Sequence, residues 1–98
     1  MAPVQMGNSF GLILLLWNAR SVLSNFVEFK RCVSVKKPHI ICLTETWLDV
    51  HSKFKLEGYT IFRKDRPDRR GGGIAVLVKN TINCEPLPNL VSFDNGKL

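Results

Sequence analysis

Two polar side chains stand directly after apolar runs in this chain of 98 residues. Glu45 follows closely on the run 40–43, and Asn18 follows the run 12–17. A carboxylate is a good ligand for a hard divalent cation, and an amide can hydrogen-bond a phosphate oxygen. Together at one edge of a sheet, the two groups would begin a site for phosphodiester chemistry. A second interpretation stays open, in which Glu45 is the first solvated residue after a strand and Asn18 is a turn residue.

A basic segment is the next candidate for chemistry. Its five cations are interrupted by two carboxylates, those of Asp65 and Asp68, and three consecutive glycines follow it. Such a segment can contact the phosphate backbone of DNA, and glycines let a main chain approach a neighbour closely. A solvated hairpin tip with ordinary turn glycines is the alternative. The five basic residues are Arg63, Lys64, Arg66, Arg69 and Arg70.

The elements that must position Asn18 and Glu45 follow from apolar periodicity. The runs 12–17 and 40–43 have the length and composition of strands buried on both faces. A helical segment separates them, so the chain predicts one βαβ unit with parallel strands and a right-handed crossover. Ligands bind at the carboxyl ends of such strands, and we expect Asn18 and Glu45 to emerge together at that edge of the sheet.

The helical segment has start and stop signals. Asn25, with Glu28 three residues later, is a capping-box arrangement, and Ser21 and Ser24 are alternative caps. Pro38 prevents continuation of the helix. Between these signals apolar residues recur at helical spacing, which predicts an amphipathic helix. Its apolar face consists of Phe26, Phe29, Cys32 and Val33.

The second half of the chain changes to a different pattern. Segments 59–63 and 74–78 are rich in β-branched and apolar residues, and the charged turn and glycines between them predict an antiparallel hairpin. Residues 49–57 are predicted to form a loop. We predict a loose leader over residues 1–11, the organised part of the domain over 12–80, and an irregular tail over 81–98, where Pro86 and Pro88 break regular structure.

Composition limits the class of protein. Hydrophobic residues make up 45% and charged residues 22%, which predicts a small globular domain and excludes a disordered chain. The net charge of +6 suits a polyanion, either nucleic acid or an anionic membrane surface. Three widely spaced cysteines without a Cys-x-x-Cys pair argue against a zinc site or a disulfide framework and fit a reducing compartment.

The apolar run near the N-terminus does not predict export or a membrane span. No Lys or Arg precedes it, as in a signal peptide, and it is shorter than the ~20 apolar residues of a membrane-spanning helix. We therefore expect a nuclear or cytoplasmic protein that is not secreted and has no membrane partner.

Four motifs in order resemble the apurinic-type endonuclease domain of non-LTR, jockey-like LINE retrotransposons, which belongs to the endonuclease/exonuclease/phosphatase superfamily. The resemblance spans about two-thirds of the chain, and only the first part of that domain. It implies the α/β class, as an incomplete α/β/β/α sandwich made of a βαβ unit followed by a β-hairpin. The motifs are Trp17-Asn18-Ala19-Arg20-Ser21, Ile41-Cys42-Leu43-Thr44-Glu45-Thr46-Trp47-Leu48, Gly58-Tyr59 with Arg63-Lys64-Asp65-Arg66, and Arg70-Gly71-Gly72-Gly73-Ile74-Ala75-Val76.

The resemblance also implies roles for two residues. Glu45 matches the glutamate that binds the catalytic Mg²⁺, and Asn18 matches the asparagine that helps position the phosphate and the catalytic groups. The family's enzymes nick one strand of DNA by attack of water on phosphorus. In a retrotransposon polyprotein, a downstream reverse transcriptase domain then extends the nicked target.

The later motifs of that domain do not occur in this sequence. No Asp-x-Asn and no Asp-His pair is present, His39 and His51 lie at other places, and Asp94-Asn95 has the wrong spacing. We therefore predict a fragment of a magnesium-dependent DNA endonuclease that is inactive alone. The resemblance implies Mg²⁺ in the complete domain, whereas this fragment supplies one metal ligand, Glu45, and one phosphate contact, Asn18, of the several oxygen ligands that a magnesium site needs. The alternative is a non-catalytic retroelement remnant with weak binding to nucleic acid.

Overall fold

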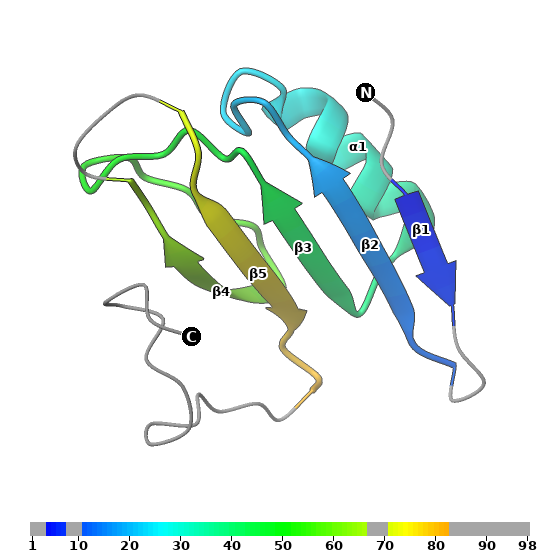
Figure 1. Cartoon of the computed structure of the whole chain (residues 1–98). Helices are drawn as coiled ribbons and strands as arrows, with labels where there is room; N and C mark the ends of the chain where they lie inside the picture. Colours follow the sequence, from blue (N-terminus) through cyan, green and yellow to red (C-terminus); the bar gives the residue numbers. More distant parts are fainter. Residues whose placement is uncertain (1–3, 8–10, 67–70, 83–98) are drawn as a thin grey trace, which may run out of the picture.

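The computed structural model describes residues 4–7, 11–66 and 71–82, which form one mixed sheet and one helix (Figure 1). The order across the sheet is β1-β2-β3-β5-β4. This arrangement confirms the α/β class, with a βαβ unit followed by a hairpin. The elements are β1 (Val4–Gly7), β2 (Ile13–Asn18), α1 (Phe26–Lys36), β3 (Ile40–Thr44), β4 (Tyr59–Lys64) and β5 (Ile74–Lys79).

The parallel pair β2 and β3 forms the centre of the molecule. Leu15 is paired with Ile41, and Asn18 at the end of β2 is paired with Thr44 at the end of β3. Side chains alternate between the two faces of each strand, and Leu15 and Ile41 are completely buried on the face that packs against α1. Figure 1 shows the helix behind β2, on the side toward β1.

Four aromatic rings join the helix, the sheet and the predicted loop after β3. Trp17 of β2 stacks on Phe29 of α1 with 5.4 Å between ring centroids. Phe54 comes from the loop and packs against both Phe26 and Phe29, with 6.1 Å between centroids in each pair. The loop therefore closes one side of the core although it contains no helix or strand.

The helix begins and ends where the sequence predicts, but the predicted capping box is wrong. Asn25 occupies the N-cap position, yet its side chain makes no capping hydrogen bond. Its Nδ2 instead donates to three carbonyls of the loop that leaves β2, because the amide is turned back toward that loop. At the other end Lys37 adopts a left-handed conformation and donates its N–H to Val33. The three carbonyls belong to Ala19, Arg20 and Ser21.

The N-terminal segment differs from the predicted loose leader. Residues 4–7 form β1, which pairs antiparallel with β2 from Val4↔Leu16 to Gly7↔Ile13. The buried strand β2 has main-chain hydrogen-bond donors and acceptors along both of its edges. β3 pairs with one edge, and β1 pairs with the other. Apolar periodicity does not report such pairing, because it depends on the partner strand. The tail from residue 83 onward, with Asp94–Asn95, lies outside the described residues.

The hairpin forms as predicted, with β4 and β5 antiparallel from Tyr59↔Lys79 to Lys64↔Ile74. β5 inserts between β4 and β3, so the hairpin extends the sheet. Within the described residues, the face of the sheet opposite α1 carries several apolar side chains that are only partly buried. They are Leu14, Leu16, Ile40, Cys42, Phe62 and Val76. No helix within the described residues is long and apolar enough to cross a membrane.

Candidate active site

The loops that follow β2 and β3 run side by side beyond the ends of the strands. Main-chain hydrogen bonds continue the parallel pairing past the last paired residues, Asn18 and Thr44. The backbone thus brings Asn18 and Glu45 to one edge of the sheet, as their positions after two parallel strands predict. The three continuing bonds are Ala19 N to Thr44 O (2.8 Å), Ser21 N to Glu45 O (2.9 Å) and Val22 N to Thr46 O (3.1 Å).

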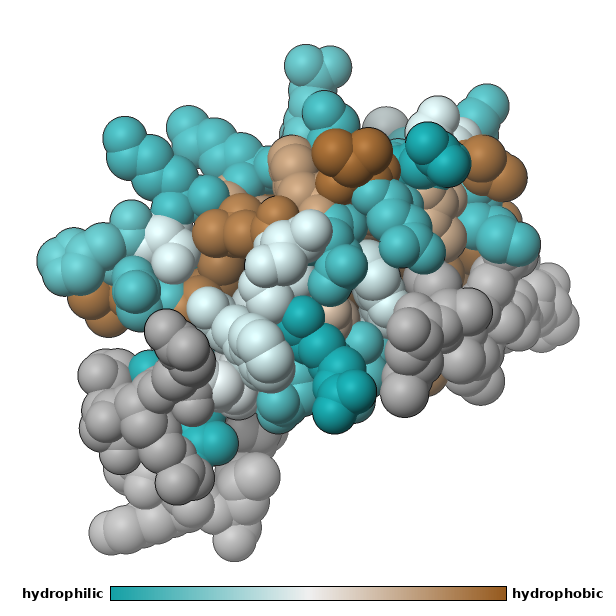
Figure 2. All heavy atoms as spheres, turned by 90° about the horizontal axis from the view of Figure 1, so that it is seen from above, coloured by the Kyte–Doolittle hydropathy of each residue, from teal (hydrophilic) through white to brown (hydrophobic). Residues whose placement is uncertain are grey.

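A second line of hydrogen bonds holds the same segment from its other side. Thr46 donates its N–H to the carbonyl of Gly73 (3.3 Å), and Trp47 donates its N–H to the carbonyl of Gly72 (2.9 Å). The segment 45–47 is therefore fixed between the loop after β2 and the glycines before β5. Figure 2 looks down on this edge of the molecule, where hydrophilic residues surround separate apolar patches.

The backbone of this segment is strained. Glu45 has φ of 53° and Trp47 has φ of 57°, in the left-handed region that non-glycine residues rarely adopt. Such conformations cost about 1–2 kcal/mol per residue and persist where surrounding contacts over-determine them. Hydrogen bonds on both sides supply that constraint. Strained residues of this kind cluster at functional sites.

The glycine run is required by a close approach as well as by the turn. Gly73 has φ of +90°, and a Cβ built on it would lie 2.4 Å from Oγ1 of Thr46, which is completely buried. A Cβ on Gly72 would lie 2.0 Å from Cδ of Arg66. The sequence predicted turn geometry here, and the structure adds that side chains pack directly against the glycine backbone.

Two oxygen donors mark the edge as a candidate cation site. Glu45 is partly exposed, and its Oε1 accepts a hydrogen bond from Nε1 of Trp47 (3.1 Å). Oδ1 of Asn18 is buried and has no hydrogen-bond partner. A buried acceptor without a partner is unfavourable, and a cation or water would satisfy it. Mg²⁺ prefers oxygen ligands and uses only one or two carboxylates beside water, so this donor set fits it.

The donor set at this edge is small. Within residues 4–7, 11–66 and 71–82, no group of three or more His, Cys, Asp or Glu residues could hold a metal ion.

The sequence did not predict the hydrogen bond that Trp47 donates to Glu45. The sequence contains one sign of this bond, which is that a tryptophan stands two residues after the glutamate. In a regular strand that spacing places both side chains on one face, but it does not predict a hydrogen bond between them.

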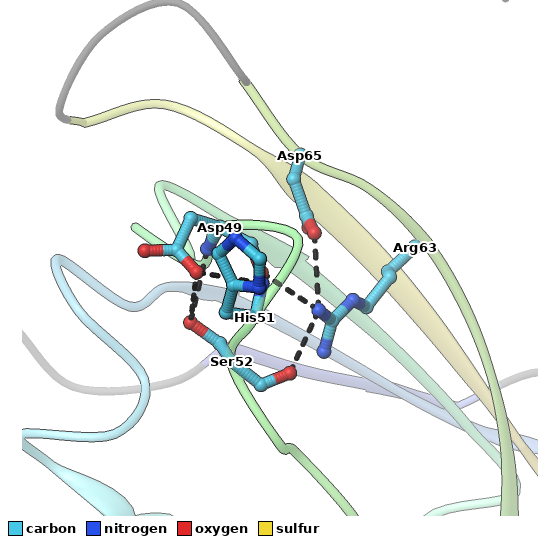
Figure 3. A network of polar contacts seen from close by, with 5 residues as sticks. All are labelled: Asp49, His51, Ser52, Arg63 and Asp65. Carbon is cyan, nitrogen blue, oxygen red and sulfur yellow. Dashed lines mark hydrogen bonds and ion pairs between the residues drawn. The ribbon is translucent and has the colours of Figure 1, made fainter.

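The predicted nucleic-acid-binding residues have different environments. Arg63 is partly buried, and its Nη2 donates to the carbonyls of Asp49 and Ser52 (2.9 Å each) and pairs with Oδ2 of Asp65 (3.1 Å; Figure 3). It ties the loop after β3 to β4. Lys64 is exposed, Arg66 packs over Gly72, and Arg69 and Arg70 lie outside the described residues.

An aspartate, a histidine and a serine also gather in that loop, but not as a catalytic triad. Oδ1 of Asp49 accepts from the main-chain N–H of His51 (2.8 Å) and from the hydroxyl of Ser52 (3.3 Å; Figure 3). These hydrogen bonds hold the pKa of the Asp49 carboxyl below its usual value, and the bond from His51 has the largest effect. Because His51 contributes its main chain rather than its imidazole, the arrangement is an Asx turn.

Comparison with known proteins places this geometry in a family context. The model of the Endonuclease/Exonuclease/phosphatase family matches residues 15–97. Among solved structures, the AP endonuclease LMAP from Leishmania major matches with a TM-score of 0.59 and 23% sequence identity, over 69% of this chain and 24% of that chain. This chain thus spans about a quarter of the length of that protein, and the likeness supports the incomplete sandwich predicted from the sequence. No curated protein matches.

Proposed function

The chain belongs to the Endonuclease/Exonuclease/phosphatase family, and from this premise we propose that it is a fragment of a magnesium-dependent DNA endonuclease. The Leishmania major neighbour is an AP endonuclease by name, which supports a nuclease among the activities of the family. The four sequence motifs support the endonuclease of a non-LTR retrotransposon, which nicks target DNA and is followed by a reverse transcriptase domain.

One observation carries the proposal most directly. Adjacent parallel strands deliver Asn18 and Glu45 to the same edge, and Oδ1 of Asn18 is buried there without a protein partner. Asn18 and Glu45 would hold Mg²⁺ through the amide oxygen and the carboxylate. When bound, the ion supplies positive charge that offsets the charge developing on the phosphate oxygens. Glu45 would hold the ion through its carboxylate, and the amide of Asn18 would help to position the scissile phosphate beside it.

The same geometry supports the inactivity of the 98 residues alone. Hydrolysis needs a base that takes a proton from the attacking water. His39 lies at the opposite end of β2 and β3, where Nδ1 accepts a hydrogen bond from the N–H of Ile13 (3.0 Å). His51 belongs to the Asx turn after β3. His39 is therefore away from the edge that carries Glu45, and His51 is held in its turn through its main chain.

The test compares two glutamates in a product that contains the later motifs. The 3′ end of the transcript shows whether the reading frame continues through an Asp-x-Asn and an Asp-His motif. If it does, we expect the longer product to nick supercoiled plasmid in Mg²⁺, and Glu45→Gln to abolish nicking. Glu28→Gln, on the exposed side of α1, serves as the control and should nick normally. Undiminished nicking by Glu45→Gln would contradict the assigned role.

A message that stops after Leu98 would favour the alternative, a non-catalytic remnant. The net charge of +6 supports weak association with DNA in that case. Binding measured by fluorescence anisotropy with a labelled duplex should then weaken steeply with added salt, because neutralised phosphates release their counterions.

A further inference from the structure

We infer that Trp47 is a positioning residue that aims the carboxylate of Glu45 at the cation. This inference rests on the proposed function, because it assigns a role within the same site. The indole Nε1–H donates to Oε1 of Glu45 at 3.1 Å. The bond leaves Oε2 and the second lone pair of Oε1 available to a ligand.

The environment of Trp47 differs from that of a core residue. The side chain is 44% exposed, whereas Trp17 is 5% exposed and packs in the aromatic cluster. Core packing therefore does not account for its position. The main chain does, because Trp47 donates its N–H to Gly72 and adopts a left-handed conformation. A Cβ on Gly71 would lie 3.8 Å from Nε1, so the indole lies against the glycine run.

The chemistry of the indole suits this role. Tryptophan has a single side-chain donor and no acceptor, so Trp47 can orient the carboxylate without offering a competing oxygen or nitrogen to the cation. An unrestrained glutamate side chain samples several rotamers, and a partly exposed Glu45 would lose that freedom on binding a cation. Hydrogen-bond partners of metal-ligating groups typically change metal affinity or activity by about 10- to 100-fold.

The first experiment needs no metal and uses the whole chain labelled with ¹⁵N. The chain has two tryptophans, so its spectrum contains two indole N–H signals, and that of Trp17 is an internal reference. Glu45→Gln weakens the acceptor because it replaces a charged oxygen by a neutral one. We expect the Trp47 indole proton to move upfield in Glu45→Gln while the Trp17 signal stays in place. An unchanged Trp47 signal would overturn the inference.

The second experiment measures the consequence for a cation, with Mn²⁺ as the probe and its free concentration read by electron paramagnetic resonance. Trp47 is replaced by phenylalanine, and separately by benzothienylalanine, which keeps the size of the indole but carries sulfur in place of N–H. We expect both changes to weaken Mn²⁺ binding by about 10-fold or more. Val50→Ala, at an exposed side chain of the following loop, should leave binding unchanged.

The two experiments separate failure of the inference from failure of the proposed function. Wild-type affinity for Mn²⁺ in the benzothienylalanine protein would overturn the positioning role. A wild-type chain that binds no Mn²⁺ would count against the proposed metal site, and the spectrum of Glu45→Gln would still decide whether Trp47 holds the carboxylate. If Trp47→Phe does not fold, the Glu45→Gln comparison decides the matter without altering Trp47.

Discussion

Replacing Gly73 by alanine tests the contact that holds the candidate site against β5. A Cβ at this position would lie 2.4 Å from Oγ1 of Thr46, well inside the 3.0 Å limit of real Cβ contacts. Thr46 is completely buried, and its N–H is bonded to the carbonyl of Gly73. The two residues can separate only if the strained segment 45–47 moves.

Gly58 provides a matched control. Its φ of +88° is close to the +90° of Gly73, but a Cβ there would meet nothing within 4 Å. Gly58→Ala should therefore cost only the backbone strain, about 1–2 kcal/mol of unfolding free energy. Gly73→Ala adds overpacking of about 1–3 kcal/mol, so we expect a total loss of about 2–5 kcal/mol.

Urea unfolding followed by circular dichroism measures both losses. Thr46→Ala removes the hydroxyl with which the new methyl group collides, so combining it with Gly73→Ala should recover the steric part of the loss. A double-mutant cycle should then give a coupling energy of about 1–3 kcal/mol. Equal losses for Gly58→Ala and Gly73→Ala, with no coupling to Thr46, would refute the close-packing explanation.

Three further predictions use the same unfolding assay. Thr46→Val should stabilise the protein by about 1 kcal/mol, because Oγ1 is buried without a partner, and a loss of stability would contradict this. Phe29→Ala, at the centre of the aromatic cluster, should cost about 3–5 kcal/mol, whereas Val27→Ala on the exposed side of α1 should change stability by less than about 0.5 kcal/mol. Burial raises the pKa of the Tyr59 hydroxyl above its ordinary value. Stability that is present below that value should be lost as the pH rises through the folded-state pKa, and Tyr59→Phe should remove this alkaline loss.

Much of the fold follows from short-range patterns in the sequence. The runs 12–17 and 40–43, with an amphipathic helix between them, permit essentially one handed βαβ arrangement. That arrangement alone predicts that Asn18 and Glu45 share an edge of the sheet. The hairpin β4–β5 is also local, since its two strands follow each other in the sequence.

Other features depend on partners that are distant in the sequence. The pairing of β1 follows from the unsatisfied edge of β2, and the place of β5 follows from its contact with β3. Periodicity describes which face of a strand is apolar, but it does not choose the neighbouring strand. The side-chain amide of Asn25 likewise points toward the loop after β2, because it donates to three carbonyls of that loop.

The candidate site divides in the same way. The apolar pattern and the handedness of the βαβ unit place its two oxygen donors, Asn18 and Glu45. Both follow strands that run in the same direction, so both lie at the same edge of the sheet. Three further contacts arise only when separate loops pack together: Trp47 against Glu45, Gly73 against Thr46, and Arg63 against the loop 49–52. Each depends on a side-chain torsion or a positive φ that the surrounding contacts impose, and no residue type specifies such a conformation without them.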